Sequence, residues 1–222
     1  MRSLLSLPLL LALAAVARPA PTAEEKKDVA RLEKAGADVT VDESLSEPAR
    51  LRVTFEKLDD KAAAALKGNK RVAVLVVEDA AGVTDRTLAT IGTLTNLREL
   101  TLVKPGMMNA GLSPLKGLKE LRKLVLIDAK LYDSGVAPLK GNSKLEELDL
   151  SGTLITNAAA ATLRTLSGLR LLAVNKTKFG DAGAAQLKDL SELRKLEAVA
   201  SDVTEKGAKA LEEANKAVRV RR

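Results

Sequence analysis

Leucines recur at intervals of 24 residues along most of the chain, and this period limits the possible folds more than any other feature. Two leucine columns, three positions apart, begin at Leu97 and Leu100 and stay in register through the last third of the chain. Further columns give each unit the form L-x-x-L-x-L-x(4)-φ-x-[DN]-A-G-x(3)-L-x-x-L-x-x, in which φ is apolar. With one inserted residue and a degenerate start, the pattern extends over residues 51–217 and predicts about seven units of roughly 24–25 residues.

Each unit contains a short strand followed by a helix. Leu148 and Leu150 alternate with Glu147 and Asp149, which is the pattern of a strand with one buried face. Apolar residues then recur at helical spacing after an Asp or Asn that is placed to cap the helix, and a nearby glycine allows close packing. Because such a unit cannot bury its own apolar faces, the units must stack, with a parallel sheet on the concave side and helices on the convex side.

The pattern resembles the leucine-rich-repeat family over residues 51–217. The nearest variant, L-x-x-L-x-L-x-x-T-x-[VI]-T-D-A-G-L, is seen in LEELDLSGTLITNAAAATL (145–163), LRLLAVNKTKFGDAGAAQL (169–187) and, degenerate, LRKLEAVASDVTEKGAKAL (193–211). Where many family members have an Asn or Cys ladder, this chain has Thr153 and Thr177, with Ala129 and Ser201 in the same column, and the hydroxyls are expected to bond buried backbone groups. The resemblance implies an α/β fold, a right-handed leucine-rich-repeat solenoid or horseshoe.

Repeats of this Thr type are similar to those of exported bacterial repeat proteins, which implies a binding module. The related Cys-type repeats belong to F-box substrate receptors of ubiquitin ligases. Because this chain shows no F-box and begins with an export signal, we do not expect a ubiquitin role.

The first residues, 1–17, have the pattern of a signal peptide. Arg2 precedes an apolar run of about 13 residues, which is shorter than the ~20 needed to cross a bilayer as a helix. Ala15 and Ala17 fit the −3 and −1 positions of a cleavage site, although Arg18 and Pro19 directly after it are unfavourable. An uncleaved anchor is therefore the alternative, and we expect an exported location: periplasmic, cell-envelope or extracellular.

Two further segments are expected to close the ends of the stack. Residues 18–50 are predicted to form an N-terminal segment and cap, a helix then a strand, because Val29, Leu32 and Ala35 share one helix face before Gly36. Residues 218–222 are predicted to form a C-terminal end strand. The mature chain would then be one elongated domain.

The composition argues against catalysis. The chain has no His and no Cys, which removes the commonest general base, thiolate chemistry and the usual zinc ligands. We expect no catalytic, cofactor-binding or metal-binding residues and no cofactor. The net charge of +7 does not predict nucleic-acid binding, because both signs are interspersed along the chain and stacking aromatics are absent from the basic tail.

Two acidic clusters, Glu146–Glu147–Asp149 and Asp59–Asp60, leave two interpretations. One is a metal site or a pair of catalytic carboxylates. The other is structural: Asp60 occupies the helix-capping column, and Glu146 lies in a column between Arg122 and Arg170 on adjacent strands. Opposite charges facing each other across strands account for such a cluster without a ligand, and we favour this interpretation.

A candidate contact patch lies on the outward columns of two neighbouring strands. Val103, Val125 and Ile127 are apolar at positions expected to face solvent, beside Arg98 and Arg122. An apolar patch with a charged rim is typical of an interface. Strand propensity alone would also place β-branched residues there, and both interpretations remain open.

The sequence therefore predicts an exported, non-catalytic, monomeric module that binds an unknown protein ligand on its concave face. The alternative is a structural or envelope-associated repeat protein, held at a membrane by an uncleaved signal anchor or at a surface by charge. Salt-sensitive retention on membranes would favour this alternative.

The first prediction concerns export. If residues 1–17 are removed, mass spectrometry of the native protein should find an N-terminus between Arg18 and Glu24. Intact Met1 in a membrane fraction would instead favour the anchor. Intact Met1 in the soluble cytoplasm would exclude export.

Overall fold

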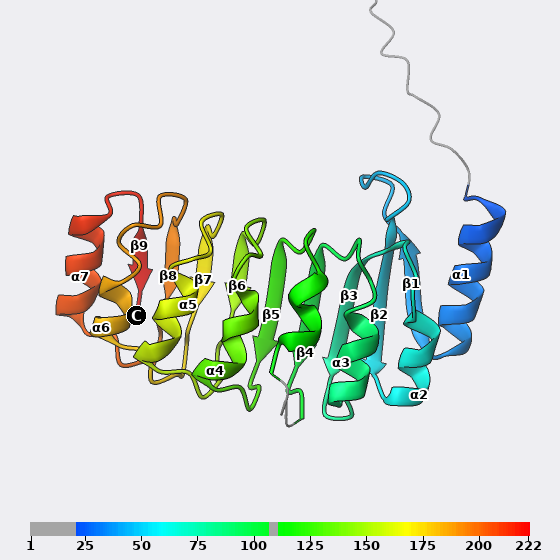
Figure 1. Ribbon diagram of the computed structural model, residues 1–222, viewed down its shortest axis with the longest axis horizontal. Helices are drawn as coiled ribbons and strands as arrows, with labels where there is room; N and C mark the ends of the chain where they lie inside the picture. The colour runs from blue at the N-terminus through cyan, green and yellow to red at the C-terminus, as the bar shows by residue number, and fades with distance from the viewer. Residues whose placement is uncertain (1–20, 107–110) are drawn as a thin grey trace, which may run out of the picture.

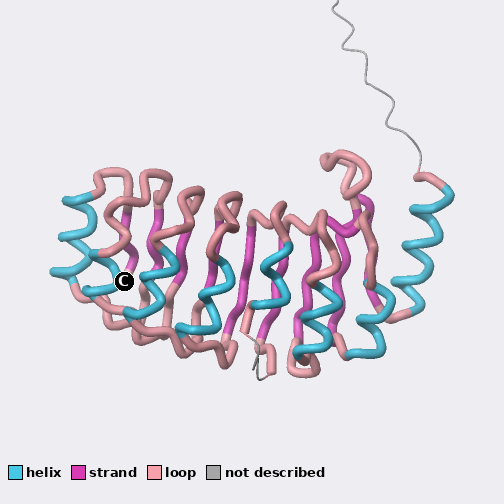
Figure 2. Tube along the Cα trace, in the orientation of Figure 1, coloured by secondary structure: helices cyan, strands magenta, loops and turns pink. Residues whose placement is uncertain are grey.

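The computed structural model describes residues 21–106 and 111–222, so the predicted signal peptide lies outside the described residues. Nine strands form one sheet in sequence order, and short helices pack against one of its faces (Figure 1; Figure 2). The strands are β1 (Ala37–Val41), β2 (Leu51–Lys57), β3 (Val72–Asp79), β4 (Glu99–Val103), β5 (Lys123–Ile127), β6 (Glu147–Asp149), β7 (Leu171–Ala173), β8 (Lys195–Glu197) and β9 (Arg219–Arg221). The α-helices are α1 (Ala23–Lys34), α2 (Asp60–Ala63), α3 (Asp85–Ile91), α4 (Asp133–Val136), α5 (Ala160–Leu163), α6 (Asp181–Ala185) and α7 (Glu205–Ala214). The 3-10 helices are η1 (Ala64–Leu66), η2 (Ser113–Gly117), η3 (Ala137–Leu139) and η4 (Asn157–Ala159).

The strand register follows the leucine columns, which confirms the predicted solenoid. From β2 to β9 every strand pairs in parallel with the next, whereas β1 is antiparallel to β2. In the centre, Leu148 is the register partner of Leu124 on one side and of Leu172 on the other. All three side chains are fully buried. Residues that are 24 apart in sequence are therefore direct neighbours in the core.

Hydroxyls of the Thr column satisfy buried carbonyl groups, as the sequence predicts. Thr153 Oγ1 donates to the carbonyl oxygen of Leu150 at 2.6 Å, and Thr177 Oγ1 donates to that of Val174 at 2.7 Å. Ser201 makes the equivalent bond to Ala198, also at 2.7 Å. Thr153 and Thr177 are themselves buried, so these hydroxyls supply the hydrogen bonds that the turn lacks once it is out of water.

The Asp/Asn column has a different role from the predicted one, since these residues do not cap their own helices. Asp181 is the first residue of α6, and its carboxylate oxygens accept from Thr204 N and Thr204 Oγ1, both at 2.7 Å, in the following unit. Asn157 Oδ1 likewise accepts from Gly180 N and Gly183 N. The side chain reaches forward to the start of the next helix. This column therefore couples neighbouring units instead of capping the N-terminus of its own helix.

The following glycines make room for these side chains. A Cβ on Gly183 would lie 2.8 Å from Asn157 Oδ1 and from the Phe179 ring. A Cβ on Gly207 would overlap the Asp181 carboxylate. The sequence predicts close packing at the glycine column. At Gly183 and Gly207 the partner is the polar side chain of the preceding unit, whereas Gly111 and Gly135 pack against each other.

Both ends of the sheet have specific contacts. At the N-terminal end, Leu32 of α1 is fully buried, and Gly36 (φ +93°) leads the chain into β1. At the C-terminal end, Glu212 of α7 accepts a hydrogen bond from Val220 N at 2.8 Å on the outer edge of β9. An edge strand with a free N–H group is a template for pairing with another chain, and this contact removes one such group.

A buried asparagine, Asn142, lies in a core column that also holds leucines. Asn142 occupies the column of Leu118 and Leu166, is 1% exposed, and has no hydrogen-bond partner for either side-chain polar atom. An unsatisfied buried amide costs about 1–3 kcal/mol, so Asn142→Leu should raise the free energy of unfolding by a similar amount. Urea denaturation measures the change, with Ser143→Leu at the exposed neighbour as the control. A destabilised Asn142→Leu variant would show that the amide has a bonding partner.

Candidate functional site

The face of the sheet without helices, the open face, presents the residues that alternate with the core leucines. The register places Glu99, Lys123 and Glu147 side by side in one column. In the next column, Val125 lies between Thr101 and Asp149. Adjacent strands are about 4.8 Å apart, so each column is a continuous row of side chains across the sheet.

Ion pairs across the strands account for two of the three carboxylates of the central acidic cluster, as the structural interpretation predicts, and Asp149 accepts a hydrogen bond from Ser151 N at 2.8 Å. Glu146 pairs with Arg122 on one side and, at 3.5 Å, with Arg170 on the other. Glu147 pairs with Lys123 at 2.8 Å. These carboxylates balance neighbouring cations, and within residues 21–106 and 111–222 no group of three acidic side chains could hold a metal ion.

The same pairs shift the ionisation of their members. The hydrogen bond that Lys123 donates to Glu147 raises the pKa of the Lys123 ammonium group, against the opposing effect of burial. The hydrogen bond from Lys195 lowers the pKa of Glu197. Both shifts favour the charged forms of these two groups.

The structure brings the five predicted patch residues onto adjacent strands or their entry turns. Val103 and Ile127 are direct register partners between β4 and β5, and Val125 is two residues before Ile127. The three apolar side chains are half-buried, Arg98 is half-buried, and Arg122 is exposed. The apolar residues therefore form one contiguous strip, with the two arginines at the end of the sheet where the strands begin.

The loop between β1 and β2, residues 42–50, is a part of this face that the sequence did not reveal. Its residue Ala49 packs with Val74 of β3, and both are buried, while Leu45 covers the same cluster. Arg98 Nη2 donates to Ser46 Oγ at 3.3 Å. The loop lies outside the repeat, so no column could place it, and only the apolar Leu45 between polar neighbours hinted at a contact.

A hollow of about 290 Å³ lies between this loop and the strand starts. Leu45 forms one wall, and the charged residues at and just before the starts of β4, β5 and β6 form the rest, namely Arg98, Glu99, Arg122, Lys123, Glu146 and Glu147. In the described part of the chain, Arg98 has no carboxylate within ion-pair distance, in contrast to Arg122. The hollow therefore offers one uncompensated guanidinium beside an apolar side chain.

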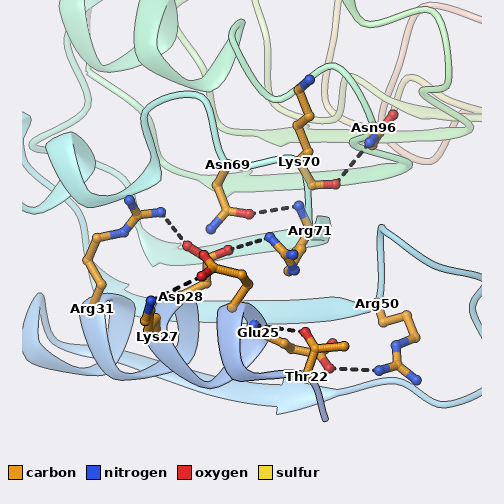
Figure 3. A network of polar contacts seen from close by, with 11 residues as sticks. Thr22, Glu25, Lys27, Asp28, Arg31, Arg50, Asn69, Lys70, Arg71 and Asn96 are labelled. Carbon is orange, nitrogen blue, oxygen red and sulfur yellow. Dashed lines mark hydrogen bonds and ion pairs between the residues drawn. The ribbon is translucent and has the colours of Figure 1, made fainter. Parts of the chain in front are cut away.

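A buried ion pair holds the loop in place (Figure 3). Arg50, at the end of the loop, donates from Nη2 to Glu25 Oε2 of α1 at 2.7 Å, and both side chains are less than 10% exposed. Arg50 also pairs with Glu47 inside the loop at 3.2 Å. Asp28 of α1 links Arg31 to Arg71, which ties the same helix to the start of β3. The N-terminal helix thereby fixes one wall of the hollow.

Comparison with known proteins supports the fold. An internalin C2 of Listeria monocytogenes str. 4b F2365 superposes with a TM-score of 0.50 at 19% identity, covering 70% of this chain and 64% of that one. An internalin (InlF) of the same strain gives 0.39 at 20% identity, covering 71% and 56%. This chain thus spans less than two thirds of either internalin. No protein-family model and no curated protein matches it.

The parallel sheet, the leucine core and this similarity together define a leucine-rich-repeat solenoid. Within residues 21–106 and 111–222, no helix combines the length and apolar character needed to cross a membrane. The open face has paired charges, an apolar strip and a hollow under a loop. These are features that can bind a partner by shape and charge.

The buried pair generates the prediction for this site. Arg50→Met leaves Glu25 buried without its cation and should lower the free energy of unfolding by about 3 kcal/mol, because breaking a buried pair from one side typically costs ~3–5 kcal/mol. Hydrogen exchange should accelerate across residues 42–50. Replacing both partners, Glu25→Leu with Arg50→Met, should recover most of the loss.

Arg31→Met is the matched control, since its pair with Asp28 is on the surface and should change stability by less than ~1 kcal/mol. An Arg50→Met variant as stable as Arg31→Met, with unchanged exchange in the loop, would contradict the proposed role of the pair.

Proposed function

We propose that this chain is an exported, non-catalytic module that binds a protein partner on the open face of its sheet. The observation that carries the proposal is the apolar strip of Val103, Val125 and Ile127, which is contiguous and half-buried beside two arginines. Apolar side chains and arginines are the usual energetic anchors of protein interfaces.

The chemistry of the open face also supports binding over catalysis. Glu146 and Glu147 of the central acidic cluster are engaged with cations, Asp149 accepts from Ser151 N, and the chain has no His or Cys to act as a base or nucleophile. The internalin C2 similarity adds the fold alone, because the identity is 19%. Export rests on the signal pattern in residues 1–17.

One observation favours the alternative of retention at an anionic surface by charge. Arg98, Arg122, Arg170 and Arg194 directly precede β4, β5, β7 and β8. Glu146 occupies the same column before β6 and pairs with Arg122 and Arg170, so the column has a net positive charge. A column with a net positive charge can attract an anionic surface, and such attraction is weakened by salt.

The test is capture of partners from the native cell envelope with the full chain as bait. Val125→Lys with Ile127→Glu should remove most binding, because charges then stand in the desolvated centre of the interface. The new lysine faces Asp149, an opposite charge on the neighbouring strand. The free energy of unfolding should therefore change by less than about 1 kcal/mol.

Lys188→Glu, at an exposed position after α6, is the control and should capture the same partners as the unaltered chain. Unchanged affinity in the double variant would show that the strip reflects strand propensity alone. Release of all captured material by moderate salt, from both variants equally, would favour the charge-retention alternative.

A further inference from the structure

Tyr132 lies in a column of residues before helices in which threonine is the commonest residue. Gly180 is another exception and, like Tyr132, makes no side-chain cap. In the same column, Thr84, Thr156 and Thr204 accept hydrogen bonds from backbone N–H groups of the helices or turns that follow them. Tyr132 precedes α4 and makes no side-chain cap. Losing a Thr cap is destabilising, so this position has a residue that folding does not favour.

Leu154 is a second departure from the pattern. Its column otherwise holds glycine or polar residues, namely Gly82, Gly106, Lys130, Lys178 and Asp202. Leu154 is 45% exposed and Tyr132 is 62% exposed. The two phenylalanines of the chain are fully buried. Residues that break a local rule without a structural gain commonly mark a functional site.

The two departures meet in one hollow of about 560 Å³ at the edge of the solenoid where the strands end, the lower edge in Figure 1. This edge hollow is lined by turns of successive units. Besides Tyr132 and Leu154, it contains Asp133, Thr153, Thr156, Lys176, Thr177, Lys178 and Ala200. It shares no residue with the hollow beside Leu45 on the open face.

The edge hollow is lined by two lysines and one carboxylate, so its net charge is positive. Asp133 is already engaged, since its oxygens accept from Thr156 N at 2.7 Å and Thr156 Oγ1 at 2.8 Å. Lys176 and Lys178 are exposed, and neither has a carboxylate within 4.0 Å among the described residues. The hollow therefore combines two exposed apolar side chains with two ammonium groups that have no ion-pair partner among the described residues. Its one carboxylate, on Asp133, is held by the neutral donors of Thr156.

We propose that the edge hollow binds an acidic peptide segment of a partner protein, with an apolar side chain against Tyr132 and Leu154 and carboxylates on Lys176 and Lys178. Apolar contact and opposite charge then act together, as at the centre and rim of protein interfaces. This surface is separate from the open-face strip, so it would be a second contact.

A displayed library of random heptapeptides tests the chemistry of the occupant. The full chain is the selecting protein, and Tyr132→Thr with Leu154→Lys, which restores the residue types of the repeat, is used for counter-selection. Enriched sequences should carry at least two acidic residues and one apolar residue. Enrichment of neutral or basic sequences, or no enrichment above the counter-selected variant, would overturn the proposal.

Binding at this site can be followed by intrinsic fluorescence, because Tyr132 is the only tyrosine of the chain and the chain has no tryptophan. Titrating the most enriched peptide, made without Tyr or Trp, should change the Tyr132 fluorescence in a saturable manner. Lys176→Gln with Lys178→Gln should weaken binding at least tenfold. Lys116→Gln with Lys188→Gln, at exposed positions elsewhere, should leave it within twofold.

Tyr132→Thr separates binding from folding. By calorimetry it should bind the same peptide at least tenfold more weakly, with an unchanged or higher melting temperature, because the cap is restored. Unaltered peptide affinity in this variant would overturn the proposal. The open-face variant Val125→Lys with Ile127→Glu should bind the peptide normally, so failure of one site is distinguishable from failure of the other.

Discussion

The stacking of leucines from successive units is the interaction on which the rest of the structure depends. A single strand-and-helix unit leaves its core side open, and Leu148 is buried only because Leu124 and Leu172 lie against it. Parallel hydrogen bonding fixes the register of these contacts. The same register sets the open face, where residues 24 apart become neighbours and Glu146 comes to lie between Arg122 and Arg170.

Polar contacts also link neighbouring units along the stack. Asp60, Asp133, Asn157 and Asp181 reach forward to the next unit, as Asp181 does to Thr204. Gly183 and Gly207 leave space for the side chains of Asn157 and Asp181. Units are therefore coupled on both the sheet side and the helix side. Against this regular background, Tyr132 and Leu154 are conspicuous because the repeat needs neither of them.

Much of the fold could be predicted from the sequence, because residues that are one repeat length apart in the chain become neighbours in the structure. The core columns, the Thr hydroxyl bonds and the Glu146 ion pairs all follow from this spacing. The target of the Asp/Asn column could not be predicted, since spacing does not distinguish a helix's own N–H groups from those of the next unit. Nor could the loop of residues 42–50, which occurs once. Residues after the strands, such as Lys176 and Ala200, have positive φ without being glycine, so composition gave no sign of that turn.

Native-state hydrogen exchange on Leu148→Asp tests the stacking account most directly. A charge in the dry centre should cost at least about 2–5 kcal/mol and expose amides of β5, β6 and β7 first, while β2 and α7 keep their protection. Leu171→Asp puts the same side chain on the open face of the next strand, between Glu147 and Lys195, and should leave exchange almost unchanged. Equal exchange patterns in the two variants would contradict the register and, with it, the solenoid described above.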